Sequence, residues 1–109
     1  MIISTTNHVD GYQVVEYMRV ISGETIFGMN AWRDLGASIR NIIGGRAEGW
    51  EQEVASARET ALSELFERGQ QLGADAVIGV KLDFTAMGTD NGMVMVTATG
   101  TAVRLAPSI

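Results

Sequence analysis

The sequence lacks cysteine and contains a single histidine, a single lysine and a single proline. Without cysteine there are no disulfides, no thiol nucleophile, no iron–sulfur cluster and no zinc site built on thiolates. No apolar run approaches the roughly 20 residues that span a bilayer, and the first residues show neither a basic region nor a signal core. We therefore expect an unprocessed cytoplasmic protein that does not enter membranes.

The charge balance limits the partners of the chain. Its net charge of −5 opposes binding to nucleic acid and to anionic membrane surfaces, which attract positive charge. Seven of its eight cationic residues are arginines, and arginine is favoured in protein interfaces and in the binding of carboxylates. At 109 residues, 46% of them hydrophobic, the chain is expected to form one domain, residues 1–109, with a core of modest size.

The most regular stretch runs from Trp50 to Leu72 and predicts one long helix. Glu64 lies four positions before Arg68, a spacing that favours an ion pair on the helix surface. Gly73 suits the left-handed conformation that ends a helix, whereas Gly69 costs about 1 kcal/mol relative to alanine and indicates a close approach to another backbone. The apolar residues recur mostly every three or four positions, which places them on one face: Val54, Ala57, Ala61, Leu62, Leu65, Phe66 and Leu72.

Before this helix, the pattern predicts strands and a shorter helix. Met1–Thr6 is a short segment that favours β-structure, and Tyr12–Ile21 has the β-branched and aromatic residues of a long strand. We expect the glycine-containing segment 22–24 to interrupt this strand and Thr25–Met29 to form a further short one. Asp34–Ile43 has the apolar spacing of a short helix, which the Gly44-Gly45 pair would end.

After the long helix, the pattern predicts a β-hairpin. Ala76–Thr85 alternates in character, and its even-numbered residues are expected to face the helix. The hairpin turn is predicted at residues 90–92, an Asp-Asn-Gly sequence. Met93–Leu105 would form the last strand, with small residues such as Gly100 leaving room for the helix. The chain is thus predicted to be α+β, with one long helix packed on a small three-stranded antiparallel sheet.

A sheet covered on one face by one helix leaves its other face without a partner. Here that face would carry Met93, Met95, several threonines, and Tyr17 or Val15. An exposed apolar area of this extent usually marks an association surface. We therefore expect a homo-oligomer, and a closed one, because closure also covers the sheet edges.

Five blocks of sequence occur in a fixed order along almost the whole chain. They are Gly44-Gly45-Arg46, Trp50-Glu51, Ala57-Arg58-Glu59, the stretch from Leu72 to Val80 (LGADAVIGV) and the stretch from Ala98 to Val103 (ATGTAV). Together these blocks resemble the YbjQ-type family of small bacterial and archaeal proteins. The resemblance implies a dodecin-like β-α-β-β subunit that assembles as a ring, usually a pentamer. It also implies the family's heavy-metal-binding label, although the function of the family is uncharacterised.

The family's heavy-metal-binding label can be compared with the metal-ligating side chains that the sequence contains. Soft metals favour thiolate, thioether or imidazole ligands, and the chain has no cysteine, one histidine (His8) and six methionines. Met93 and Met95 would share a strand face and could form a copper(I) or silver site repeated by symmetry. Interface packing is the favoured interpretation, because methionine fills irregular gaps well. His8 is best explained as a turn residue, and the metal ligands, if any, remain unknown.

Arginines around Gly44-Gly45 form the second candidate site. Backbone N–H groups at a helix junction, together with Arg40 and Arg46, could hold a phosphate or a carboxylate. Trp50 could stack on such a ligand, although anchoring a loop is the simpler role. Ion pairs between these arginines and carboxylates such as Asp34 are the favoured alternative. The ligand-binding candidates are therefore Arg40, Arg46, Trp50 and Asp34.

No nucleophile–base pair is visible, so the sequence gives little support for an enzyme. The leading interpretation is a non-enzymatic, cytoplasmic homo-oligomer, pentameric by the family resemblance, with a structural or a ligand- or partner-binding role. The alternatives are a heavy-metal-binding protein, and a small-anion binder or enzyme with sites between subunits near Arg40 and Arg46.

Overall fold

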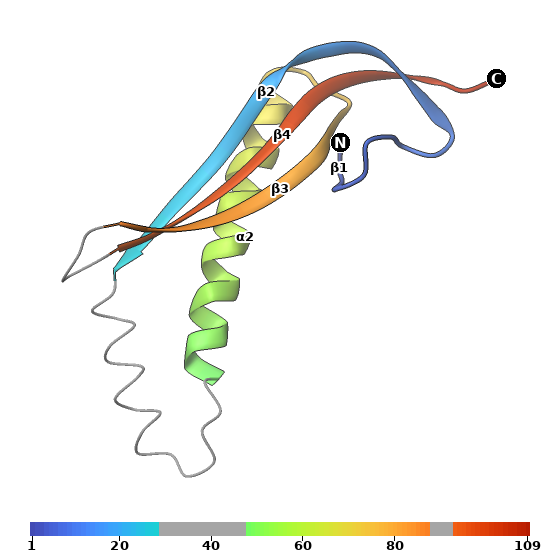
Figure 1. The fold of residues 1–109 in the computed structure, drawn as a ribbon. Helices are drawn as coiled ribbons and strands as arrows, with labels where there is room; N and C mark the ends of the chain where they lie inside the picture. Colours follow the sequence, from blue (N-terminus) through green and yellow to red (C-terminus); the bar gives the residue numbers. More distant parts are fainter. Residues whose placement is uncertain (29–47, 88–92) are drawn as a thin grey trace.

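The computed structural model describes residues 1–28, 48–87 and 93–109, which fold into two layers: one helix lies against one face of a curled sheet (Figure 1). The sheet has four strands in the order β1-β3-β4-β2. The β4 strand is antiparallel to both β2 and β3, whereas β1 pairs in parallel with β3. The elements are β1 (Ile2–Ile3), β2 (Tyr12–Gly28), α2 (Glu48–Gln71), β3 (Ala76–Met87) and β4 (Met93–Pro107).

The predicted α+β class and long helix are confirmed. The sheet has one strand more than the three predicted, namely the short parallel strand β1. The predicted helix at Asp34–Ile43 and the predicted turn at 90–92 lie outside the described residues. Because β2 and β3 run in the same direction on either side of β4, α2 connects two parallel strands, and β3 and β4 form an antiparallel pair. The order of the described elements is therefore β-β-α-β-β, with a short first strand.

The α2 helix ends as its sequence predicts. Gly73 adopts a positive φ of 76°, its N–H donates to the carbonyl of Gln70, and the N–H of Ala74 donates to the carbonyl of Gly69. These two bonds form a Schellman motif, which satisfies carbonyls that the helix leaves without partners. The predicted stripe faces the sheet, with Ala61 and Leu65 fully buried.

Residues 22–24 do not interrupt the first long strand, so that prediction was wrong. The β2 strand continues through them, and Gly23 lies directly beneath α2. A Cβ atom at this position would stand 2.3 Å from the carbonyl oxygen of Ala61 and 2.5 Å from the amide nitrogen of Leu65. Glycine is therefore required because the strand and helix backbones almost touch, and not because the chain turns.

The β3 strand changes face at a bulge, which corrects the predicted alternation. Gly79 has a φ of 61°, and the register with β4 shifts between Ile78 and Lys81. Before the bulge, Val77 packs beneath the helix while Ala76 and Ile78 join a small cluster with Val103. After the bulge, even-numbered residues such as Val80 meet the helix-side core as expected. An extra residue in one strand reverses the inside–outside alternation of the residues beyond it.

The N-terminal segment follows the edge of β3 as far as this bulge. The N–H of Gly79 donates to the carbonyl of Thr6 at 2.8 Å, and the N–H of Val80 donates to the carbonyl of Ser4 at 3.0 Å. The segment then turns at Gly11, where φ is 85°, and enters β2. Val9 packs on the small cluster formed by Ala76, Ile78 and Val103. One end of the outer sheet face is thus covered by the chain itself.

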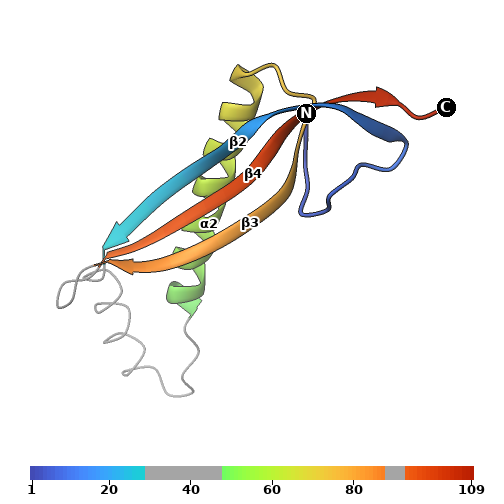
Figure 2. The same ribbon diagram turned by 45° about the horizontal axis from the view of Figure 1, so that its top comes forward.

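The molecule is extended for its length. Its principal extents are 59, 28 and 18 Å and its radius of gyration is 17.6 Å, whereas a compact chain of this size has a radius of gyration of about 13 Å. Figure 2 shows the reason: the ends of β2 and β4 project past β3 and the helix at one end. Part of the chain therefore forms a two-stranded extension that pairs with neither β3 nor the helix layer.

Candidate functional site

Three of the four predicted ligand-binding residues, Asp34, Arg40 and Arg46, lie outside the described residues. Trp50 falls in the first turn of α2, and only its backbone is described. The structure therefore leaves the anion site near Arg40 and Arg46 as a prediction.

The histidine-based and carboxylate-based metal chemistry finds no support in the described residues. No group of three or more histidine, aspartate or glutamate side chains comes together within ranges 1–28, 48–87 and 93–109. His8 lies in the segment before β2, where its Nε2 atom is 3.6 Å from a carboxylate oxygen of Asp10, and both side chains are largely exposed. These residues do not fit a centre for a hard or borderline cation, which needs several converging ligands.

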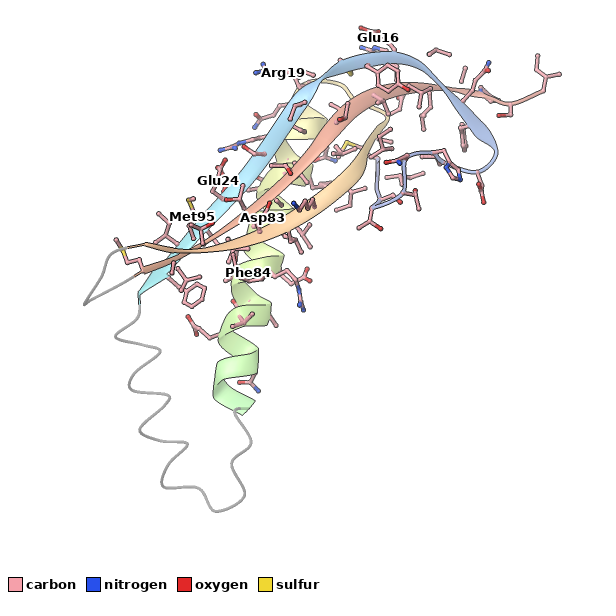
Figure 3. The ribbon with its side chains drawn as sticks, viewed as in Figure 1. Glu16, Arg19, Glu24, Asp83, Phe84 and Met95 are labelled. Carbon is pink, nitrogen blue, oxygen red and sulfur yellow. The ribbon has the colours of Figure 1, made fainter. Side chains whose placement is uncertain are left out.

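Met93 and Met95 do share a sheet face, as predicted. They lie two positions apart on β4, on the face turned away from the helix, and Met93 is exposed. Figure 3 places Met95 and Phe84 on opposite sides of the sheet, which agrees with the pairing of Phe84 with the buried Val96. Two thioethers from one chain are available there, a donor type that only soft metals favour.

Apolar side chains gather on this outer face of the sheet. By the strand register, the face carries the exposed residues Tyr17, Val20, Ile26 and Met93. Between them, the threonines of β4 at positions 97, 99 and 101 are half-buried. No described helix or strand covers these residues, apart from the N-terminal segment at one end. The register also places polar and charged side chains on this face, namely Ser22, Glu24, Lys81, Asp83 and Thr85, and Lys81 and Asp83 form an ion pair at 3.6 Å. The outer face is thus a mixed surface, whose exposed apolar residues are of the kind that proteins bury against partners.

A two-stranded arm extends from one end of the sheet. It consists of Tyr12–Glu16 of β2 and Arg104–Pro107 of β4, because β3 begins its pairing with β4 only at Val103. Glu16 and Arg104 form an ion pair across the arm at 3.4 Å, and the carboxylate of Asp75 accepts a hydrogen bond from the N–H of Leu105. Tyr12 and Val15 are about half exposed. The sequence placed these residues in strands but gave no sign that the pair would stand alone.

In contrast to the arm, part of the β2 edge is covered by a side chain of the helix. Arg68 of α2 donates hydrogen bonds to the backbone carbonyl of Ser22, to Glu24 at 3.1 Å and to Glu64. The pair with Glu64 was predicted, whereas the contacts with β2 were not visible in the sequence. The pKa of Glu24 lies below its usual value, chiefly because the Ser22 hydroxyl donates to its carboxylate, with Arg68 adding to the effect and burial opposing it. Arg68 thus shields this stretch of edge from another strand.

These observations define a class of protein: a two-layer α+β chain with a helix on one sheet face and exposed apolar residues among polar ones on the other. The chain belongs to the YbjQ family, whose model, described as "Putative heavy-metal-binding", matches residues 1–106. The resemblance found in the sequence is therefore confirmed. None of the described helices is long and apolar enough to cross a membrane.

Individual relatives agree with this assignment. The chain is 48% identical over 103 residues to a UPF0145 protein of Listeria ivanovii, covering 94% of each chain. It is 46% identical over 106 residues to a UPF0145 protein of Bifidobacterium longum, covering 97% of this chain and 96% of the relative. The fold is similar to a crystal structure of a DUF74-family protein of unknown function from Pediococcus pentosaceus ATCC 25745, with a TM-score of 0.68, 17% identity, and coverage of 97% of this chain and 98% of that chain.

Proposed function

We propose that the chain is a homo-oligomeric, non-enzymatic binding protein of the cytoplasm, whose subunits join through the two-stranded arm and the outer sheet face. The family resemblance suggests a dodecin-like ring of five copies. In this proposal the subunit alone is incomplete, and the ligand or partner is recognised by the assembly. The alternative with an anion site between subunits near Arg40 and Arg46 fits the same assembly and remains a prediction.

The two-stranded arm is the observation that carries this proposal. An isolated pair of strands is marginally stable in water and needs a third strand or a packed layer. Among the described residues the arm has no third strand, and its only packing partner is a small cluster that contacts Val14 and Leu105. The arm still exposes large apolar side chains at Tyr12 and Val15. Tyr17, at the base of the arm, is 71% exposed. A second copy would supply the missing layer at a modest entropic cost, because the arm is already ordered by its ion pair and backbone bonds.

A closed ring fits the arrangement of edges better than an open fibre. The chain has different groups at its two sides, with β2 at one edge of the sheet and β1 with the outer part of β3 at the other. Contacts between unlike surfaces produce rings when the rotation closes and filaments when it does not. Arg68 covers the β2 edge at Ser22 and Glu24, which works against continuous edge-to-edge pairing.

The experiment is a measurement of subunit number by native mass spectrometry, with the variants Tyr12→Ser and Tyr17→Ser combined. We expect a discrete oligomer for the wild type, of five subunits if the family resemblance holds, and a shift to monomers for the double variant. Phe84→Ser is the matched control, because Phe84 is an aromatic residue that is 49% exposed on the helix side of the sheet. This control should keep the wild-type subunit number.

Two results would overturn the proposal. A wild-type protein that stays monomeric at micromolar concentration would remove the assembly itself. A control variant that dissociates while the arm variant stays assembled would place the interface on the wrong side of the sheet. Far-ultraviolet circular dichroism of each variant separates loss of assembly from loss of folding.

Heavy-metal binding is kept as a second candidate, because Met93 and Met95 lie side by side on an exposed face. A site of this kind would take a soft monovalent ion such as silver(I), held by thioethers of more than one copy. Silver titration should show saturable binding that is lost in the Met93→Leu, Met95→Leu double variant. Met18→Leu is the control, since Met18 packs against the helix-side core. Equal binding by both variants would exclude the thioether site.

A further inference from the structure

A cavity of about 550 Å³ opens between β2 and the last turn of α2. This volume lies within the range of pockets that hold small molecules. The cavity is built from one chain, and two of its lining residues, Val20 and Thr99, also belong to the outer sheet face proposed for assembly. Its walls combine apolar side chains with polar groups that can form hydrogen bonds: Val20, Ile21 and Leu72 supply the apolar part, and Arg19, Ser22, Arg68, Gln71 and Thr99 supply the polar part.

The charged side chains that line this cavity are both arginines. Arg68 is held in place by Glu24, Glu64 and the Ser22 carbonyl. These three bonds use three of the five N–H donors of a guanidinium, so two donors remain for another acceptor. Neither glutamate lines the cavity. Arg68 is therefore a fixed donor at the wall rather than a freely moving cation.

Arg19 is the second cation, and its charge is not compensated within the described residues. It is exposed on β2, next to the register shift at Tyr17–Arg19, and Figure 3 shows it extending from the strand near the end of α2. No described residue forms an ion pair or a hydrogen bond with its guanidinium. A carboxylate would find in Arg19 a planar donor of matching geometry.

The end of α2 could oppose an anion here, because the C-terminal end of a helix carries partial negative charge. The Schellman bonds reduce this effect, since the carbonyls of Gly69 and Gln70 accept hydrogen bonds from Ala74 and Gly73. A direct contact between a guanidinium and a carboxylate also outweighs a partial charge at greater distance. The cavity therefore favours a negatively charged ligand despite its position.

We propose that this cavity binds a small amphipathic monoanion, namely a carboxylate carrying a short aliphatic chain. Arg19 contacts the carboxylate, and the free donors of Arg68 or the Gln71 amide complete its hydrogen bonds. The aliphatic chain packs on Ile21 and Leu72, which lie on the helix side of β2. The mixture of one free cation with apolar walls selects against inorganic anions, which leave the apolar walls uncovered, and against neutral alcohols, which leave the cation unpaired.

The test uses octanoate as the probe, with binding followed by amide chemical shifts of the isotope-labelled protein. Arg19→Gln removes the charge and retains a polar side chain. Arg58→Gln is the matched control, because Arg58 is also exposed, does not line the cavity and forms no ion pair with a described residue. We expect saturable octanoate binding that Arg19→Gln weakens about ten-fold and that Arg58→Gln leaves unchanged. Octanol, acetate and inorganic phosphate should each bind at least about ten-fold more weakly than octanoate.

Three outcomes would overturn this inference. They are the absence of saturable octanoate binding, an equal loss in both arginine variants, and phosphate binding as tight as that of octanoate. Shift changes that map to the outer sheet face instead of the last turn of α2 would also contradict it. Native mass spectrometry of the same samples reports the subunit number separately, so failure of the cavity proposal is distinguishable from failure of the assembly proposal.

Discussion

The two faces of the sheet come from the same strands but have opposite surroundings. On the helix side, the β4 residues Val96, Ala98 and Ala102 are completely buried. On the outer side, Tyr17 is 71% exposed and Val20 is 69% exposed. Alternation along each strand thus separates residues that are buried beneath the helix from residues that are exposed on the outer face. Substitutions on the two faces should affect different quantities, namely the free energy of unfolding and the number of subunits.

The largest expected effect is at the centre of the helix-side core. Leu65→Ala removes a fully buried side chain and should lower the free energy of unfolding by about 2–5 kcal/mol. Val20→Ala, on the outer face, should lower it by less than about 0.5 kcal/mol when both proteins are monomeric. Urea unfolding measures the two losses. The protein concentration should be low enough that the wild type and both variants are monomeric, because assembly would stabilise the folded state. Equal losses would mean that the two faces are not distinct.

The second effect compares two glycines that receive the same substitution. Gly23→Ala forces a Cβ atom into the backbone of α2 and should cost about 3 kcal/mol. At Gly69, an added Cβ would meet Met1 atoms at 3.0 Å and Val77 Cγ2 at 2.9 Å. The thioether can move, but Val77 is fully buried and must shift, which offsets the preference of about 1 kcal/mol that alanine has over glycine in a helix. Gly69→Ala should therefore cost about 1 kcal/mol, less than Gly23→Ala. Thermal unfolding of the two variants side by side tests whether the backbone contact decides the outcome.

Gly69 also shows what the sequence could and could not predict. Its presence in a helix correctly indicated a close neighbour, but the neighbours are the side chains of Met1 and Val77 rather than another backbone. The helix, its apolar stripe and its end at Gly73 were predictable, because they depend on residues close together in the chain. The continuity of β2 through Gly23 was not predictable from the sequence, because glycine is needed there for a contact with the helix, which is distant in the chain.

The candidate surfaces also differ in how far the sequence could predict them. An apolar outer face followed from the alternation of β4 and from the expectation of a single covering helix. The arm depends on where β3 stops pairing with β4, and the cavity depends on Arg19 lying near the end of α2. Both are set by register and by contacts between distant segments, which local patterns do not specify. The bulge at Gly79 had a weak signal, since a glycine inside a strand often marks one.

A third, smaller effect is expected at Gly100, which the sequence suggested would leave room for the helix. An added Cβ would stand 2.6 Å from Val77 Cγ1 and 3.2 Å from Val80 Cγ2, so the crowding arises from β3 and not from the helix. Gly100→Val should cost about 1–3 kcal/mol. Combining it with Val77→Ala should recover part of the loss relative to the sum of the single variants. Strict additivity in urea unfolding would show that β3 is not the obstacle.

The smallest effect concerns the part of the β2 edge that Arg68 covers. The pKa of Glu24 is lowered from 4.5 in the folded protein, so its ionised form contributes stability above that value. This contribution is lost as the pH falls through the lower, folded-state pKa, where Glu24 takes up a proton. Because Glu24 and Arg68 are 37% and 41% exposed, solvent screening limits the effect to at most about 1 kcal/mol.

Glu24→Gln should therefore lower the free energy of unfolding at about pH 6, and its difference from the wild type should shrink towards about pH 3. Glu59→Gln is the control, since Glu59 is an exposed glutamate of α2 with no ion pair to a described residue. Urea unfolding of the three proteins across this range provides the measurement. A constant difference at all pH values would assign the effect of Glu24 to packing alone. A difference that follows the pH would show that a charged contact within one chain stabilises the covered part of the β2 edge, in contrast to the arm, for which we propose stabilisation by a second copy.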